Sequence, residues 1–94
     1  MGDCYQIIKK KILNSKINLA VIGLGYVGLP LALLFGKNFT TIGIDSCLSK
    51  IKRLRRFIDD AEQCSNKDFR AAKKIKFTNS YKHLYSADII IVCL

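Results

Sequence analysis

The chain has 94 residues, a length that fits one small domain. Half of the residues are hydrophobic and there is one proline, so the composition is globular and excludes a disordered tail. The formal net charge of +9 allows a nucleic-acid, membrane or anionic partner. However, the basic residues alternate with apolar ones at helical spacing, and no aromatic stacking platform or zinc module accompanies them. We therefore expect no nucleic-acid binding.

The four cysteines, Cys4, Cys47, Cys64 and Cys93, form no C-x-x-C pair and no metal-ligand spacing with the single histidine, His83. This pattern predicts neither a metal site nor a disulfide framework. Cys93 lies in an apolar run and is expected to be a small buried hydrophobic residue. The cysteine usage fits a reducing, cytoplasmic environment.

The first predicted element is a short amphipathic helix over Tyr5–Leu13, within an N-terminal extension of residues 1–18. The apolar run Leu19–Ile22 follows, and its branched residues are typical of a strand buried in a parallel sheet. Gly23–Gly28 then predicts a turn, and Leu29–Phe35 predicts a helix that ends near a glycine.

A membrane helix is an alternative for Leu19–Gly36, because this stretch carries no charge and follows several lysines. Its glycines and Pro30, however, cluster where a strand must turn into a helix. A second β-type segment, Thr40–Ile44, follows at once. We therefore expect no membrane segment here.

Two more helices are predicted beyond that second strand. Apolar residues recur at helical spacing over Leu48–Ile58, with Ser46 or Ser49 as the expected cap. Ser65–Asp68 has the form of a capping box, which predicts a helix over Asn66–Lys73.

The last elements are a third strand over Ile75–Thr78, a helical turn over Tyr81–Tyr85 and a fourth strand over Asp88–Leu94. Strands therefore alternate with helices along the chain. This order predicts the α/β class: residues 19–94 form the N-terminal half of a Rossmann-type doubly wound parallel sheet, with about four strands.

The sequence GLGYVG at residues 23–28 matches the dinucleotide-binding pattern G-x-G-x-x-G, and it follows a predicted strand and opens a predicted helix. In this setting Gly23 permits the tight turn, Gly25 lets the backbone approach a pyrophosphate, and Gly28 lets the helix pack close to the strand. Amide groups at the start of the helix then face the phosphates. The predicted pyrophosphate-binding residues are Gly23, Gly25, Tyr26, Val27 and Gly28.

An acid follows the second strand, about twenty residues after the first glycine, as the same pattern requires. The carboxylate of Asp45 is expected to accept hydrogen bonds from the adenosine ribose and to repel the 2′-phosphate of NADP, so we expect NAD. Lys50 could reach the ribose or adenine. The alternatives are that Asp45 is an ordinary helix N-cap and that Lys50 belongs to a solvated helix face.

The stretch Leu19–Phe35, LAVIGLGYVGLPLALLF, resembles the start of the nucleotide-sugar dehydrogenases that make UDP- and GDP-linked uronic acids. Ile58–Asp60, Ser65–Ala72 and Lys76–Asn79 also resemble that family, most closely its branch acting on UDP-N-acetylglucosamine or UDP-N-acetylgalactosamine. The resemblance implies that Asp45 binds the adenosine ribose and that Lys50 and Val27 contact NAD. Cys47 departs from the asparagine that the family often has there.

The resemblance also implies an enzyme that oxidises the sugar C6 alcohol to a carboxylate, with two NAD reduced and a thiol-bound intermediate. The catalytic cysteine of the family lies beyond a Pro-Thr-Pro turn that follows the fourth strand, and none of the cysteines here matches it. We therefore assign no catalytic residue and expect a fragment that is inactive alone, with a nucleotide sugar bound only in the full-length parent.

Two other functions stay open. The chain could be a stand-alone, non-catalytic nucleotide-binding module, or a small membrane- or anion-binding protein that uses its basic faces. In either case the apolar strand Asp88–Leu94 predicts self-association through an exposed sheet edge.

Overall fold

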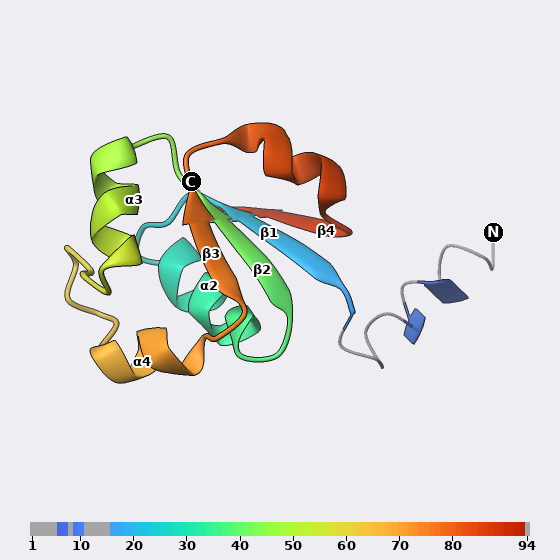
Figure 1. Ribbon diagram of the computed structural model, residues 1–94, viewed down its shortest axis with the longest axis horizontal. Helices are drawn as coiled ribbons and strands as arrows, with labels where there is room; N and C mark the ends of the chain where they lie inside the picture. The colour runs from blue at the N-terminus through green and yellow to red at the C-terminus, as the bar shows by residue number, and fades with distance from the viewer. Residues whose placement is uncertain (1–5, 8, 11–15, 94) are drawn as a thin grey trace.

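The computed structural model describes residues 6–7, 9–10 and 16–93. From residue 16 on, each strand is separated from the next by one or two helices, as the sequence predicts (Figure 1). The elements are β1 (Asn18–Ile22), α2 (Gly28–Gly36), β2 (Thr40–Ile44), α3 (Leu48–Arg55), α4 (Asn66–Ala71), β3 (Ile75–Thr78), the 3-10 helix η1 (Tyr81–Ser86) and β4 (Ile89–Val92).

The four strands form one parallel sheet in the order β3-β2-β1-β4. The chain thus builds the sheet outward from β1 to one side and then returns to its other side with β4. Both β2 and β3 have the predicted bounds, and β1 begins one residue earlier than predicted, at Asn18. The amide of Asn18, the first residue of β1, donates to Oδ2 of Asp88, the residue before β4, at 2.8 Å. This hydrogen bond joins β1 and β4 at their amino ends. The predicted Rossmann-type half-sheet is confirmed.

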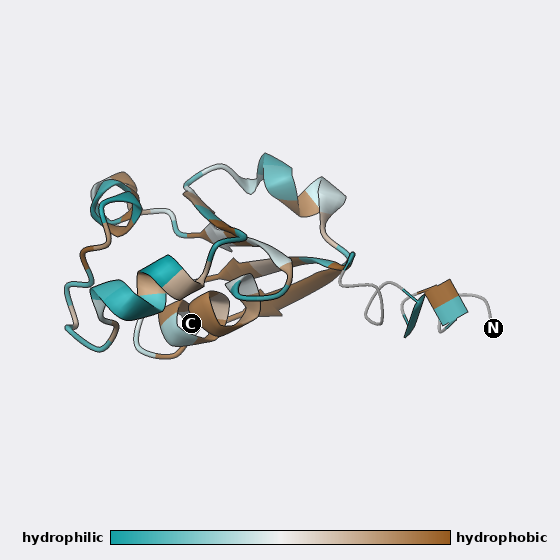
Figure 2. Ribbon diagram, turned by 60° about the horizontal axis from the view of Figure 1, so that its bottom comes forward, coloured by the Kyte–Doolittle hydropathy of each residue, from teal (hydrophilic) through white to brown (hydrophobic). Residues whose placement is uncertain are grey.

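The core lies between the sheet and the helices that connect its strands. Residues of β1, α2, α3, α4 and β3 meet in one buried cluster. Its largest buried members include Val21, Leu29, Ile51 and Phe69. Figure 2 shows the same arrangement in hydropathy, with apolar residues concentrated in the strands and α2 and hydrophilic residues on the outer turns of α4 and η1. The connecting helices thus provide most of the apolar cover of the sheet.

Three details of the predicted helices are wrong, and one is that α4 ends at Ala71 rather than Lys73. Helix α3 ends at Arg55 rather than Ile58, because Phe57 has a φ of 62° and cannot continue a right-handed helix. The N-cap of α3 is Cys47, without a side-chain cap bond, and neither predicted serine caps it. The capping box of α4 is present as predicted, with Asp68 N donating to Ser65 Oγ.

Most of the predicted helix Tyr5–Leu13 lies outside the described residues. Residues 6–7 and 9–10 are helical and exposed. The uncharged stretch Leu19–Gly36 folds into strand, turn and a nine-residue helix. Over the ranges that the structure describes, no helix combines the length and apolar character needed to cross a membrane.

Candidate functional site

The glycine turn lies between the carboxyl end of β1 and the start of α2. Gly23 has a φ of +91°, and its amide donates to Ile44 O at 2.8 Å. A Cβ on Gly23 would lie 1.7 Å from Cys93 O, and a Cβ on Gly28 would lie 1.6 Å from Gly23 O. No side chain can be accommodated at these distances. These two glycines therefore allow β1, β4 and α2 to converge at one point.

Gly25 differs from its two neighbours in the motif. A Cβ placed on Gly25 would meet nothing within 4 Å, so no contact within the described chain requires a glycine there. The helical ladder of α2 starts nearby, where Leu29 N donates to Gly25 O at 3.2 Å. The side chains of Tyr26 and Val27 are exposed. The turn thus presents open backbone at the amino end of a helix, where the helix dipole favours an anion.

The acid after β2 joins this turn to the next helix. Asp45 Oδ2 accepts from Leu24 N at 3.1 Å, and Asp45 Oδ1 accepts from Cys47 N at 3.0 Å. Lys50 Nζ donates to Leu24 O at 3.3 Å and lies 3.9 Å from Asp45 Oδ2. Each carboxylate oxygen has a second lone pair, so the group can still accept hydroxyl donors. The sequence predicted Asp45 and Lys50 at the site, but it did not predict the two hydrogen bonds that the Asp45 carboxylate accepts from backbone amides.

A cavity of about 290 Å³ adjoins the turn and contains part of the predicted site. The predicted residues Gly25, Tyr26 and Lys50 line it. Its remaining lining residues, which sequence reasoning missed, are Leu24, Asp59, Asp60 and Ala61. The volume is at the small end of the range for ligand pockets. It could hold one part of a dinucleotide, at the side of the turn that faces Lys50.

The loop that contributes Asp59, Asp60 and Ala61 to the cavity is held in place by hydrogen bonds to its own carboxylates. Asp59 accepts from the amides of Ala61, Gln63 and Cys64 at 2.9 to 3.0 Å. Asp60 is held by Arg53 of α3, whose Nε and Nη2 donate to it, the latter at 2.6 Å. This guanidinium lowers the pKa of Asp60 below its ordinary value. The Asp-Asp pair after α3 was the available sequence signal, since aspartates favour such turns.

The cysteines of the described chain occupy three different environments. Cys47 is exposed, and its hydrogen bond with Ser49 lowers the pKa of its thiol. Burial raises the pKa of the Cys64 thiol to about 11. Cys93 is partly buried and packs against the core, close to its predicted role. All three are free thiols, and none lines the cavity beside the glycine turn.

These residues fit a dinucleotide. The space over Gly25 admits a group that any side chain at this position would obstruct. The adjacent helix start offers amide donors to phosphate, and Asp45 retains acceptor capacity toward hydroxyl groups. The arrangement is therefore suited to binding a dinucleotide and orienting it.

The comparisons with known proteins agree with this geometry. Residues 17–94 match the model of the UDP-glucose/GDP-mannose dehydrogenase family, NAD binding domain. The chain is 38% identical over 76 residues to UDP-N-acetyl-D-glucosamine 6-dehydrogenase of Pseudomonas aeruginosa, which covers 81% of this chain and 18% of that protein. It is 38% identical over 77 residues to Protein CapL of Staphylococcus aureus, with 82% and 18% covered. The chain therefore spans about a fifth of the length of these relatives.

Solved structures show the same fold. A UDP-D-ManNAc dehydrogenase from Pyrococcus horikoshii superposes with a TM-score of 0.70 at 26% identity, over 83% of this chain and 20% of that one. A GDP-mannose dehydrogenase from Pseudomonas aeruginosa superposes with a TM-score of 0.72 at 21% identity, over 81% and 19%. These structures show the fold, and the family match identifies it as an NAD-binding domain. This chain belongs to the UDP-glucose/GDP-mannose dehydrogenase family and matches its NAD-binding domain.

Proposed function

We propose that the chain supplies the NAD-binding part of a nucleotide-sugar 6-dehydrogenase of the UDP-N-acetylhexosamine type, an enzyme of polysaccharide biosynthesis. The observation that carries the proposal is the open backbone of Gly25, at the start of α2 and beside the carboxylate of Asp45. The substrate class is supported by the named activity of the Pseudomonas aeruginosa relative. NAD supplies the hydride acceptor for oxidation of a sugar alcohol, and the residues of this chain bind and orient it.

Each residue of the site has a defined task in this proposal. Gly25 and the amides near Tyr26 and Val27 receive the pyrophosphate, while Gly23 and Gly28 hold the turn in place. The Asp45 carboxylate accepts the ribose hydroxyls, and Lys50 lies over Leu24 O at the same end. We assign no reacting side chain to this chain, so we expect NAD binding without sugar oxidation. The nucleotide sugar is a partner of the longer parent enzyme.

We infer two further properties of the molecule. A cytoplasmic location is supported by the free thiols of Cys47, Cys64 and Cys93, since cysteines remain reduced in that compartment. Self-association is supported by strand β4, which lies at one edge of the sheet and exposes Ile90 and Val92.

The experiment that tests NAD binding compares two variants that introduce the same side chain. Gly25→Val places a branched group in the path of the pyrophosphate, and the open space around Gly25 leaves the fold intact. Leu34→Val changes an exposed residue of α2 away from the turn and is the matched control. In calorimetric titration with NAD, we expect binding by the wild type and by Leu34→Val and a loss of about tenfold or more in Gly25→Val. Equal binding by all three proteins would remove the glycine turn from the site.

A further inference from the structure

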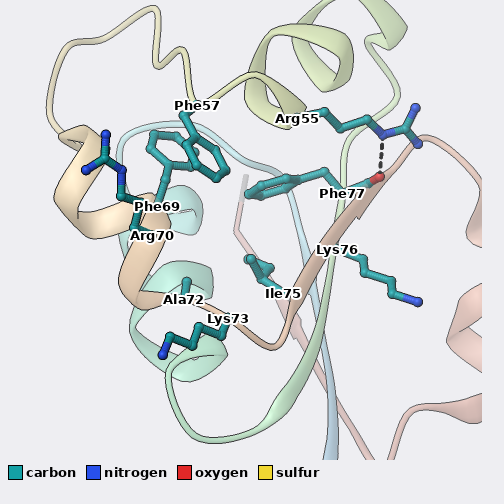
Figure 3. Close-up of a pocket in the computed structure, with 9 residues that line it drawn as sticks. All are labelled: Arg55, Phe57, Phe69, Arg70, Ala72, Lys73, Ile75, Lys76 and Phe77. Carbon is teal, nitrogen blue, oxygen red and sulfur yellow. Dashed lines mark hydrogen bonds between the residues drawn. The ribbon is translucent and has the colours of Figure 1, made fainter.

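A second hollow, with no lining residue in common with the nucleotide cavity, opens beside the edge strand β3 (Figure 3). It has a volume of about 490 Å³ and lies between the end of α3, helix α4 and β3. This volume is within the range of small-molecule pockets in proteins. The hollow is therefore larger than the cavity beside the glycine turn.

The wall of the hollow is built from three aromatic rings. Phe57 and Phe69 are stacked with ring centroids 5.3 Å apart, and Phe69 meets Phe77 edge-on at 6.2 Å. Phe69 and Phe77 are buried, whereas Phe57 is 41% exposed. Phe57 has a left-handed backbone, which is unfavourable for a bulky residue. The chain thus keeps an apolar ring at the surface in a conformation that costs free energy.

Among the described residues, the ionisable side chains that line the hollow are all basic: Arg55, Arg70, Lys73 and Lys76. In Figure 3, Arg70 and Lys73 extend from the α4 side, and Lys76 extends from the opposite side of β3 from Phe77. Side chains as long as these can turn toward a bound anion. Such a surface attracts a ligand that is both apolar and negatively charged.

A side chain occupies part of the β3 edge beside the hollow, which hinders pairing of this edge with a further strand. Arg55 Nε donates to Phe77 O at 3.0 Å, so a side chain occupies an outer acceptor of the edge. A peptide that adds to a sheet edge needs such main-chain groups free. The geometry therefore favours a compact molecule that enters the hollow over a peptide strand that extends the sheet.

We propose that this hollow is a second binding site, for a compact organic anion whose aromatic body stacks on the exposed side of Phe57. Phe57 offers an offset or edge-to-face contact, and the guanidinium and ammonium groups of the rim pair with a carboxylate, sulfonate or phosphate. The site lies apart from the glycine turn, so a ligand bound here leaves the nucleotide site free. The proposal does not depend on NAD binding.

The test uses naphthalene-1-sulfonate as the probe and follows the backbone amide signals of the whole chain by NMR. We expect saturable shifts in residues 55–57 and 69–77, and none around Gly25. The cation 1-naphthylmethylammonium and inorganic sulfate serve as probe controls, because each lacks half of the proposed recognition. Either control binding here as tightly as the sulfonate would overturn the proposal, as would sulfonate shifts confined to other regions.

Variants then separate the roles of charge and ring. Arg70→Gln with Lys73→Gln should weaken binding of the probe by about tenfold, since two charge-assisted contacts are lost. Arg56→Gln with Lys67→Gln removes the same charge from residues that do not line the hollow, and should leave the affinity unchanged. Phe57→Gly removes the exposed ring and relieves the left-handed backbone, so it should remain folded and lose binding.

Equal affinity in the two charge-removing pairs would overturn the proposal. So would full binding by a folded Phe57→Gly variant. A further result against it would be shifts of residues 55–57 and 69–77 on dilution of the protein alone, because these would identify the hollow as a contact between copies of the chain.

Discussion

At the scale of single residues, the three motif glycines are equivalent in sequence and unlike in structure. We expect Gly23→Ala and Gly28→Ala each to lower the free energy of unfolding by about 3 kcal/mol or more, because their new Cβ atoms would collide with backbone oxygens. Gly25→Ala should change it by less than about 1 kcal/mol in either direction, since the position is open. Urea unfolding of the three variants measures these differences. Equal losses in all three would contradict the geometry of the turn.

Asp45 is expected to set cofactor choice at the same scale. Asp45→Asn retains an oxygen acceptor for one of the two amides and removes the charge. It should weaken NAD binding by about 1 to 3 kcal/mol, as for a charge-assisted hydrogen bond, and relieve the repulsion of NADP. Titrations with both cofactors measure the preference, with Asp68→Asn as a control that removes an acid elsewhere. An unchanged NAD/NADP ratio would leave Asp45 as a structural bridge only.

Site residues could be predicted from the sequence where they belong to a short motif with fixed spacing. The glycines and Asp45 follow from a motif with fixed offsets, whereas the NAD contact of Lys50 was implied by the family resemblance. The structure brings Asp45 and Lys50 together beside the turn. Gly43 was missed, although a Cβ there would lie 3.0 Å from the Phe77 ring and 3.2 Å from Leu24. This need arises from packing across β2 and β3. A single sequence contains no sign of such contacts.

At the scale of elements, strands were better predicted than helix ends. Both β2 and β3 have the predicted bounds, and β1 is extended by one residue, whereas β4 spans Ile89–Val92 within the predicted Asp88–Leu94. The periodic apolar pattern after α3 continued through Phe57 and Ile58, but the backbone reverses at Phe57 and places both side chains partly in solvent. Periodicity therefore identified the helix, while its end depended on a backbone conformation that side-chain pattern does not encode.

The capping box of α4 gives a pH-dependent prediction. Hydrogen bonds from the Ser65 amide and hydroxyl hold the pKa of Asp68 below its ordinary value. Because the folded pKa is lower than the unfolded one, the charged carboxylate stabilises the fold at neutral pH. This stability is lost as the pH falls through the unfolded value of about 3.9 and then the folded one. Asp68→Asn should therefore lower Tm at neutral pH and make little difference in strong acid.

Thermal unfolding across this pH range measures the effect. Arg53 also lowers the pKa of Asp60, so the wild type loses stability in acid for more than one reason. The difference between wild type and Asp68→Asn isolates one group. Lys82→Gln, a change at an exposed residue of η1 away from the capping box, is the control. A Tm difference that persists unchanged in strong acid would show that the box acts without its charge.

At the scale of the whole molecule, the sheet could be predicted from the order of its strands and the parallel βαβ connections. Short connections and right-handed crossovers leave few other arrangements for alternating strands and helices. The hollow beside β3 could not be predicted this way. Its three phenylalanines come from the end of α3, from α4 and from β3, and only the packing of these elements brings their rings together.

Self-association depends on the position of β4 in the sheet, where it is an edge strand. In the part of the chain that the structure describes, β4 pairs with β1 alone, and its alternate residues Ile90 and Val92 are 47% and 58% exposed. An uncharged, branched edge strand is open to pairing with another copy. We expect the apparent mass in sedimentation to rise with protein concentration for the wild type. Ile90→Lys with Val92→Lys should remain monomeric, since charged residues on an edge oppose such pairing.

The matched control for that experiment is Tyr81→Lys with Tyr85→Lys, which adds the same charge to exposed residues of η1. If β4 is the contact, this control associates as the wild type does. That result would show that added charge alone does not account for the loss of association in Ile90→Lys with Val92→Lys. Should both double variants become monomeric, general repulsion between highly basic chains would account for the result. A wild type that stays monomeric at every concentration would contradict an association through β4.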